Sequence, residues 1–238
     1  WDNPASKRTV ISNDFWLLVW GPQTKNHALN FMRMPSQRVV EFGAAQFDIY
    51  SEDPNISRDE ILKAHNFSLD KKLLLYAGSS KSCDEFQHLK KIDQAITSGL
   101  LPSVNVIYRP HPWGEGGIEG TRFLNHDFKN VRIDKSMVYY LELVKKGDKK
   151  KEMAEYKDTR NLLLAVDAII SPLSTILIEG MILGKQVMCY MPIDEYNGDH
   201  FKSSWKQTHF EEFLSIPEII VAWGSSQLID CTNELINK

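Results

Sequence analysis

The stretch Lys72-Leu-Leu-Leu-Tyr-Ala77-Gly78-Ser-Ser-Lys-Ser82 decides the fold. Its first half is a continuous apolar run, which is typical of a parallel strand buried on both faces. The small residues that follow allow a ligand to approach the backbone closely, and a long helical pattern comes after them. The stretch therefore predicts a βα unit.

This alternation of strand and helix recurs along the chain. A helix is expected over residues 154–165, and an apolar helix is expected to end at Gly184. Alternation at this interval predicts an α/β fold, a Rossmann-like doubly wound parallel sheet with its ligand at the carboxyl ends of the strands. Four further strands are expected at Val104–Tyr108, Val131–Ile133, Val166–Ile170 and Gln186–Tyr190.

The first part of the chain reads as a separate unit. Two β-rich runs, Phe15–Trp20 and Arg38–Phe42, flank a helical segment over residues 25–33 and give a βαβ-like opening. Ser57-Arg-Asp-Glu60 has the spacing of a capping box, which predicts a short helix after it.

We divide the chain into residues 1–67 and residues 68–238. Because the chain starts at Trp1, inside what reads as an element already under way, we expect residues 1–67 to be the end of an N-terminal acceptor domain and a linker. The remainder of that N-terminal domain is expected to be missing. Residues 68–238 are expected to form the Rossmann-like donor-binding domain.

Composition excludes several classes of function. Hydrophobic residues make up 42% and charged residues 25% of 238 residues, as in ordinary globular proteins. The formal net charge of −3 provides no general positive field, so no nucleic-acid partner is expected. No apolar stretch reaches the roughly 18 residues that span a bilayer.

The cysteines and one basic run bear on the compartment. Cys83, Cys189 and Cys231 are odd in number and lack zinc-ligand spacing, which predicts reduced thiols in the cytoplasm. The run Lys145–Lys151 is most simply a solvated loop. The alternative is that it contacts an anionic membrane surface, which would place the protein peripherally at the inner face of the membrane.

The segment Ser171-Pro-Leu-Ser-Thr-Ile-Leu-Ile-Glu-Gly180 is the strongest local signal for a ligand site. It places Ser171, Ser174 and Thr175 where a helix begins after a buried strand, and a helix start offers free N–H groups and partial positive charge to phosphate. Glu179, about one turn further, is positioned to accept hydrogen bonds from ribose hydroxyls. The plainer alternative is that Ser174 only caps the helix and Glu179 is exposed.

A second signal is Arg109-Pro-His-Pro112, directly after an expected strand. Its two prolines stiffen the turn, so that Arg109 and His111 project reproducibly beside the cleft. A guanidinium suits phosphate, and a histidine donates to phosphate and changes charge near neutral pH. The alternative is a rigid turn with a surface histidine.

Weaker candidates surround these two. Gly78, Ser79 and Ser80 permit close approach of a ligand, and Asp134 follows the strand at Val131, although a solvated turn aspartate is an equal alternative. The spacing matches neither a dinucleotide nor a Walker fingerprint, so NAD and ATP are not expected. There is no DxD pair and no histidine ligand spacing, and so neither a metal ion nor another cofactor is expected.

Together these motifs resemble the donor-binding half of GT-B glycosyltransferases, especially bacterial surface and capsular polysaccharide enzymes and CDP-glycerol glycerophosphotransferases. Arg109-Pro-His-Pro112 is similar to the RPHP of those groups. The pattern from Ser171 to Thr175, with Gly184-Lys-Gln-Val187, resembles their (S/T)-x-x-S and GKP motifs, with Gln186 in place of the usual proline. Trp1-Asp-Asn3 and Gly43–Asp48 resemble WDN and GAPQFD segments near the interdomain cleft.

The resemblance implies a metal-independent enzyme that transfers a sugar or glycerophosphate from a nucleotide-activated donor to a polysaccharide or lipid-linked acceptor of the cell envelope. Arg109 and His111 would serve catalysis by stabilising the departing diphosphate. The small and hydroxyl residues named above, together with Asp134 and Glu179, would hold the donor. The general base would come from the N-terminal domain. A nucleotide-sugar 2-epimerase and a non-catalytic nucleotide-binding module are the alternatives; the epimerase HPN and DSGG patterns are absent.

Overall fold

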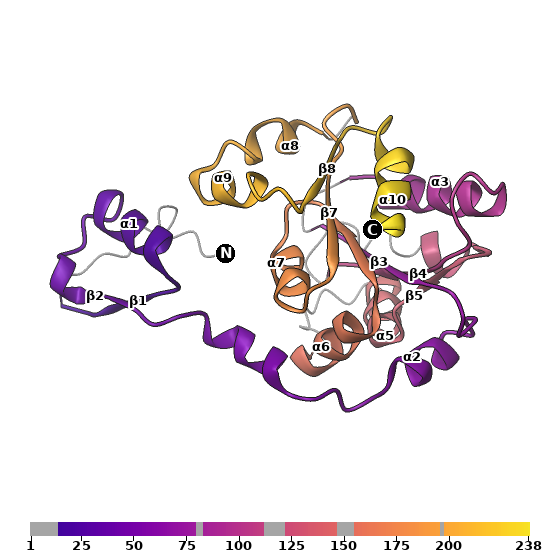
Figure 1. The fold of residues 1–238 in the computed structure, drawn as a ribbon, viewed down its shortest axis with the longest axis horizontal. Helices are drawn as coiled ribbons and strands as arrows, with labels where there is room; N and C mark the ends of the chain where they lie inside the picture. Colours follow the sequence, from indigo (N-terminus) through magenta and orange to yellow (C-terminus); the bar gives the residue numbers. More distant parts are fainter. Residues whose placement is uncertain (1–13, 80–82, 112–121, 147–154, 196–197) are drawn as a thin grey trace.

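A computed structural model describes residues 14–79, 83–111, 122–146, 155–195 and 198–238. Within these residues the chain builds two units, a small N-terminal lobe and a larger α/β domain (Figure 1).

The larger domain is built on a six-stranded, wholly parallel sheet with the strand order β5-β4-β3-β6-β7-β8. The predicted doubly wound fold class is confirmed, and β8 is a strand that sequence reading did not place. The strands are β3 (Leu73–Ala77), β4 (Asn105–Arg109), β5 (Val131–Ile133), β6 (Ala168–Ser171), β7 (Gln186–Met191) and β8 (Ile220–Trp223).

Helices cover both faces of this sheet because alternate strand residues point to opposite sides. Leu74 and Tyr76 of β3 pack with α3 (Glu85–Thr97) and α10 (Leu228–Asn237). Leu73, Leu75 and Ala77 pack with the opposite layer. That layer contains α2 (Arg58–Ala64), α6 (Tyr156–Ala165), α7 (Thr175–Ile182), α8 (Asp199–Ser204) and α9 (Thr208–Leu214).

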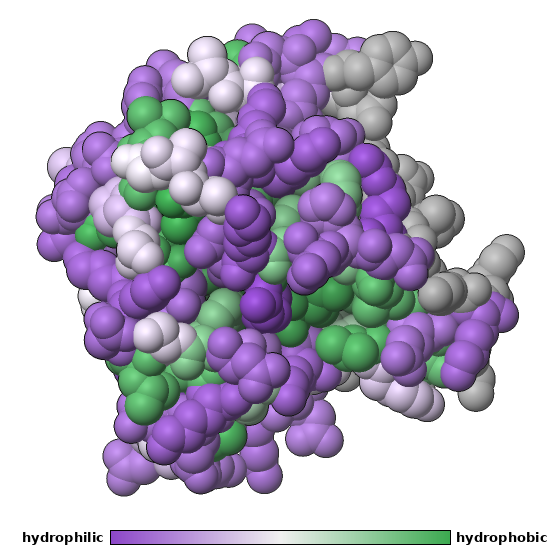
Figure 2. All heavy atoms as spheres, turned by 90° about the vertical axis from the view of Figure 1, so that its right-hand side faces the viewer, coloured by the Kyte–Doolittle hydropathy of each residue, from purple (hydrophilic) through white to green (hydrophobic). Residues whose placement is uncertain are grey.

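Helix α5 (Lys135–Lys145) follows β5 directly. It packs through Met137 and Leu141, with Ile133 against them. On the side that carries α3 and α10 the surface is largely hydrophilic, interrupted by separate hydrophobic areas (Figure 2). The apolar side chains of these two helices lie beneath that surface, in the core.

The N-terminal lobe is a βαβ unit, as expected. Its two parallel strands are β1 (Leu17–Val19) and β2 (Val39–Glu41), joined through α1 (Pro22–Asn30) and a short 3₁₀ turn, η2 (Ser36–Arg38). One face of this pair packs on α1 in a small apolar cluster. A second 3₁₀ segment, η3 (Ala45–Ser51), leads from the lobe towards α2 (Figure 1).

Helix α2 begins where the capping box predicted. The Ser57 side chain accepts from the backbone N–H of Glu60, and the Glu60 carboxylate accepts from the Ser57 N–H at 2.9 Å. Ile61 and Leu62 on this helix are buried in the core of the larger domain. The expected division between residues 67 and 68 stays a prediction.

The order of strands creates a crevice between β3 and β6. These strands are neighbours, but the chain leaves β3 towards α3 on one face and leaves β6 towards α7 on the other. The loops at their carboxyl ends therefore diverge, which is the usual position of a ligand in an open α/β sheet.

Helix α7 is held tightly against the sheet at Gly180. A Cβ added there would lie 2.3 Å from Cδ1 of Ile169 and 3.3 Å from Cγ1 of Val187, both in buried side chains. Only glycine allows the helix axis to come this close to β6 and β7.

We therefore predict that Gly180→Ala lowers the free energy of unfolding by about 1–3 kcal/mol, because the extra methyl overpacks a filled core. Urea denaturation followed by circular dichroism measures this change. Gly21→Ala is the control, since its backbone is extended and a Cβ there meets no atom within 4 Å. Equal stability of the wild-type and Gly180→Ala chains would show that α7 is not closely packed.

Candidate functional site

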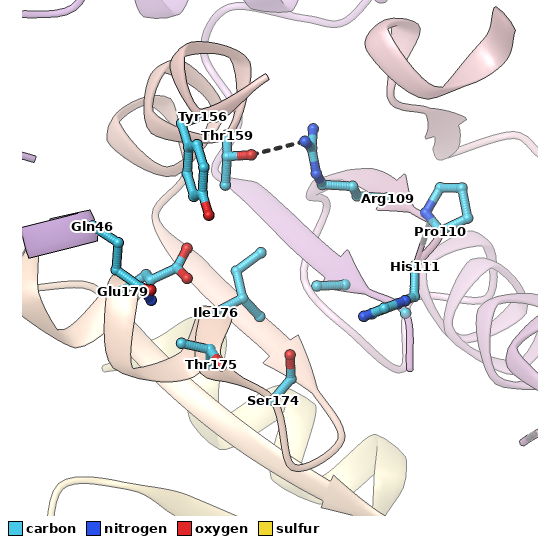
Figure 3. Close-up of a pocket in the computed structure, with 12 residues that line it drawn as sticks. Gln46, Arg109, Pro110, His111, Tyr156, Thr159, Ser174, Thr175, Ile176 and Glu179 are labelled. Atoms are coloured by element: carbon cyan, nitrogen blue, oxygen red, sulfur yellow. Dashed lines mark hydrogen bonds between the residues drawn. The ribbon is translucent and has the colours of Figure 1, made fainter. Parts of the chain in front are cut away.

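A cavity of about 280 Å³ lies at the crevice between β3 and β6 (Figure 3). Its walls come from the carboxyl ends of β3 and β4, the start of α7, the start of α6 and the segment η3. It is lined by Gln46, Ala77, Gly78, Arg109, Pro110, His111, Tyr156, Thr159, Ser174, Thr175, Ile176 and Glu179.

The start of α7 offers unused hydrogen-bond donors to this cavity. Ser174 occupies the N-cap position with extended backbone angles, but its side chain makes no capping hydrogen bond. Among the described residues, none accepts from the backbone N–H of Thr175 or Ile176, whereas Leu177 N–H donates to the Ser174 carbonyl at 3.2 Å. These free amides and the positive end of the helix dipole favour an anion at this position.

Arg109 lines the cavity but is already engaged within the protein. It is the last residue of β4, it is buried, and its guanidinium forms an ion pair with Asp134. The same group donates to Ser136 Oγ at 3.1 Å and to Thr159 Oγ1 at 2.9 Å. Its orientation is therefore fixed, and its charge is largely balanced before any ligand arrives.

Asp134 lies behind Arg109 and does not line the cavity. Besides pairing with Arg109, its carboxylate accepts from the Ser136 backbone N–H at 3.1 Å and from Ser136 Oγ at 2.9 Å, at the start of α5. The Asp134 carboxylate thus links Arg109 to the start of α5. Its expected direct contact with a donor has no support in this position.

Glu179 faces the cavity from α7, beside Gln46 and Tyr156 (Figure 3). Its Oε2 accepts a hydrogen bond from the hydroxyl of Tyr50 at 2.6 Å. Burial raises the pKa of this carboxyl above its ordinary value, and the Tyr50 hydrogen bond acts in the opposite direction. The alternative of an exposed helix glutamate is therefore wrong, since the side chain is half-buried and bonded.

The loop after β3 is shaped by a buried carboxylate. Glu85 accepts from the Ser79 backbone N–H at 2.6 Å and from the hydroxyl of Tyr108. Burial raises the pKa of Glu85 despite these hydrogen bonds. A Cβ at Gly78 would lie 2.6 Å from its Oε2, so the turn requires glycine there.

Three of the expected site residues are therefore away from the cavity wall in the structure. Ser79 is buried and directs its N–H to Glu85. Ser171 is fully buried at the end of β6, and its Oγ has no hydrogen-bond partner among the described residues. Asp134 lies behind Arg109, as described above. Ser80 lies outside the described residues.

His111 occupies the end of the cavity opposite Glu179 and extends towards the start of α7 (Figure 3). Burial lowers the pKa of its imidazole below the ordinary histidine value. The side chain is therefore largely neutral at pH 7 in the free chain.

Four residues of this site were missed by sequence reading. Tyr156 and Thr159 come from α6, and Gln46 and Tyr50 come from η3. The only sequence signal for any of them is the likeness of Gly43–Asp48 to an interdomain segment, which contains Gln46. The other three are brought in by tertiary packing.

Neither a metal-binding cluster nor a membrane-spanning helix is present among the described residues. No group of three or more His, Cys, Asp or Glu side chains is arranged to hold a metal ion there. None of the described helices combines the length and apolar character needed to cross a membrane.

Comparison with known proteins identifies the fold. No protein-family profile matches the chain, and no curated protein sequence does. Among solved structures, the wall teichoic acid polymerase TagF matches 93% of this chain and 49% of its own length, with 14% identity and a TM-score of 0.56. UDP-GlcNAc 2-epimerase from Methanocaldococcus jannaschii, in complex with UDP-GlcNAc and UDP, matches 93% of this chain and 54% of its own length, with 14% identity and a TM-score of 0.54.

The chain has a GT-B type of fold. It spans about half the length of the structures it matches. A GT-B fold with a crevice at the strand order switch places the cavity described above where this architecture binds ligands in general.

The ion pair behind the cavity provides a stability test. Arg109 and Asp134 side chains are each 8% exposed, so Asp134→Ala leaves a buried guanidinium without its counter-charge. We expect the free energy of unfolding to fall by about 3–5 kcal/mol, as measured by urea denaturation.

The double variant Arg109→Met/Asp134→Leu should recover much of this loss, because it leaves no unpaired charge. Asp199→Ala, which removes an exposed ion pair with Lys202, is the control and should leave unfolding unchanged. If Asp134→Ala were as stable as this control, Arg109 would not depend on Asp134.

Proposed function

We propose that this chain is the donor-binding half of a GT-B transferase, which moves a sugar or glycerophosphate from a nucleotide-activated donor to a polysaccharide or lipid-linked acceptor of the cell envelope. The observation that carries the proposal is the cavity at the β3–β6 crevice, where the unpaired amides of α7 lie between His111 and Glu179. Its chemistry suits a ligand with an anionic part and a hydroxyl-bearing part.

The diphosphate of the donor would bind at the start of α7. Thr175 and Ile176 supply backbone N–H groups there, and the unengaged Ser174 hydroxyl supplies a third donor. Because Arg109 is balanced by Asp134, the amides and the helix dipole provide most of the attraction. The donor nucleotide needs no metal ion in this arrangement.

The ribose would bind further along α7. Glu179 is four residues after Thr175, about 6 Å along a helix axis. A carboxylate repels phosphate and accepts from hydroxyls, so the two ends of the cavity select different parts of one nucleotide.

Catalysis would come from the same donors. As the bond to the phosphate breaks, negative charge gathers on the departing diphosphate, and fixed amides together with His111 stabilise that charge more than they stabilise the intact donor. The imidazole at this position can also pass a proton to the diphosphate. Arg109 lines the same cavity, and its ion pair with Asp134 limits what its charge adds to this stabilisation.

The acceptor and its general base would belong to an N-terminal half, since this chain covers only about half of the structure it matches. The exposed face of the β1–β2 pair supports such a neighbour, because parallel sheets are normally covered on both faces. Four large apolar side chains are exposed there: Trp16, Leu18, Val40 and Phe42. We place this reaction in the cytoplasm at the inner face of the membrane, where lipid-linked acceptors are accessible.

Nucleotide-sugar 2-epimerisation is the second candidate. The TM-scores to TagF and to the UDP-GlcNAc 2-epimerase are close, 0.56 and 0.54, so the fold favours neither chemistry. Incubation with UDP-GlcNAc followed by proton NMR separates the two. Conversion to the 2-epimer without an acceptor would overturn transfer in favour of epimerisation.

Calorimetric titration with UDP, CDP and GDP tests donor binding. We expect one of the three to bind, and Ser174→Ala to weaken it by about 1–3 kcal/mol through loss of its hydroxyl donor next to phosphate. Ser203→Ala, on the exposed surface of α8, is the matched control. Absence of binding by all three at millimolar concentration would contradict the proposal.

The lowered pKa of His111 predicts that nucleotide binding depends on pH. Its pKa lies below the ordinary value in the free chain, and a nearby diphosphate raises that pKa because it favours the imidazolium. Binding therefore takes up a proton, and affinity should rise as pH falls from about 8 towards 6. A nucleotide sugar is the suitable probe, because both of its phosphates are esterified and do not titrate in this range.

In His111→Gln this rise should disappear, whereas Ser174→Ala should bind more weakly and keep it. Affinities of UDP-glucose, or of the CDP or GDP counterpart selected by the first titration, are measured calorimetrically at each pH. The same slope in His111→Gln and wild type would place the titrating group elsewhere.

A further inference from the structure

Tyr50 connects the segment between the two lobes to the cavity. It lies in η3, it is 8% exposed, and its hydroxyl donates to Oε2 of Glu179 at 2.6 Å across 129 positions of sequence. Among the described residues no other group donates to the Glu179 carboxylate. One oxygen of that carboxylate is thus bonded to Tyr50, and the other accepts from no group of the described residues.

The proton in this hydrogen bond stays on Tyr50. Burial, followed by the adjacent Glu179 charge, raises the pKa of the phenol far above its ordinary value. Tyr50 is therefore a permanent donor, and Glu179 is a permanent acceptor towards it. This fixed polarity holds the carboxylate in one rotamer, facing the cavity beside Gln46 (Figure 3).

The segment that carries Tyr50 is fastened on both sides. Phe47 packs edge-on against Trp20 of the N-terminal lobe, with ring centroids 5.3 Å apart, and Tyr50 itself packs in the core of the larger domain. Just after η3, the buried Arg160 of α6 binds Glu52 at 2.7 Å and Asn55 Oδ1 at 2.9 Å. Tyr50 therefore has a defined position relative to α7.

We propose that Tyr50 is a positioning residue that orients Glu179 towards the ribose hydroxyls of the donor. Selection of ribonucleotides then depends on η3 keeping its position against the larger domain. This inference rests on the proposed function, since it requires a nucleotide in the cavity. It assigns to the inter-lobe segment a direct part in substrate selection. Removal of the Tyr50 hydroxyl frees Glu179 to turn away from the ligand, while the phosphate contacts at α7 are unchanged.

The test compares UDP and CDP with their 2′,3′-dideoxy counterparts by calorimetry. Wild type should prefer the ribonucleotide, and Tyr50→Phe should bind it about 10-fold more weakly, as expected for loss of a hydrogen bond to a charged group. The affinity for the dideoxy compound should be the same in both chains. Glu179→Gln should likewise reduce the preference, and Tyr139→Phe, an exposed tyrosine on α5, is the matched control.

The outcomes separate this inference from the proposed function. If wild type binds none of UDP, CDP and GDP, the proposed function fails and the inference fails with it; if GDP is the nucleotide that binds, GDP and its 2′,3′-dideoxy counterpart are the pair compared. If wild type prefers ribonucleotides and Tyr50→Phe keeps the full preference, only the inference is overturned. Equal weakening of ribo and dideoxy compounds in Tyr50→Phe would also overturn it, because that result indicates a general structural role.

Discussion

The adjacency of β3 and β6 is the constraint on which the site depends. The chain builds outward from β3 through β4 to β5, then returns to place β6 on the free side of β3 and continues to β7 and β8. Right-handed crossovers then require α3 and α7 to lie on opposite faces of the sheet. No helix or loop can fill the space where these two connections part, so a crevice follows from topology alone.

The charge distribution in this crevice explains how it can attract an anion without a net positive surface. The whole chain carries a formal charge of −3, and the one arginine that lines the cavity is paired with Asp134. What remains are the amides at the start of α7, which need no counter-ion and carry no desolvation cost comparable to that of a buried cation. Such a site recognises phosphate by geometry, and Glu179 at its other end excludes a second anion.

Sequence reading placed the parts of the fold whose signal is local. The apolar runs of β3, β4, β6 and β7 and the capping box of α2 are patterns of a few adjacent residues, and each predicted its element. The helices α8 and α9 are short and lack a sustained periodic face, and β8 after them is a run of only four residues, Ile220–Trp223. The strand was missed for that reason.

The candidate site shows the same division. Gly78, Arg109, His111, Ser174, Thr175 and Glu179 all line the cavity, and the sequence could suggest them because each lies at or within about one turn of the end of a strand or the start of a helix. Asp134 was placed at the correct end of its strand, but the sequence does not show that Arg109 turns back towards it. Tyr50 had no local signal, since its contact with Glu179 depends on the path of η3 between the lobes.

That path also bears on how a two-lobed protein could link binding to lobe arrangement. A ligand that binds the second oxygen of the Glu179 carboxylate does not compete with Tyr50, because Tyr50 bonds only Oε2. When η3 shifts, Glu179 loses its only donor among the described residues, and a buried carboxylate without a donor is unfavourable. A bound ribose would supply replacement donors. Tyr50 in its present position and a ribose bound in the cavity would therefore both stabilise the Glu179 carboxylate through hydrogen bonds. In this way the position of the segment that joins the lobes would affect the affinity of the site.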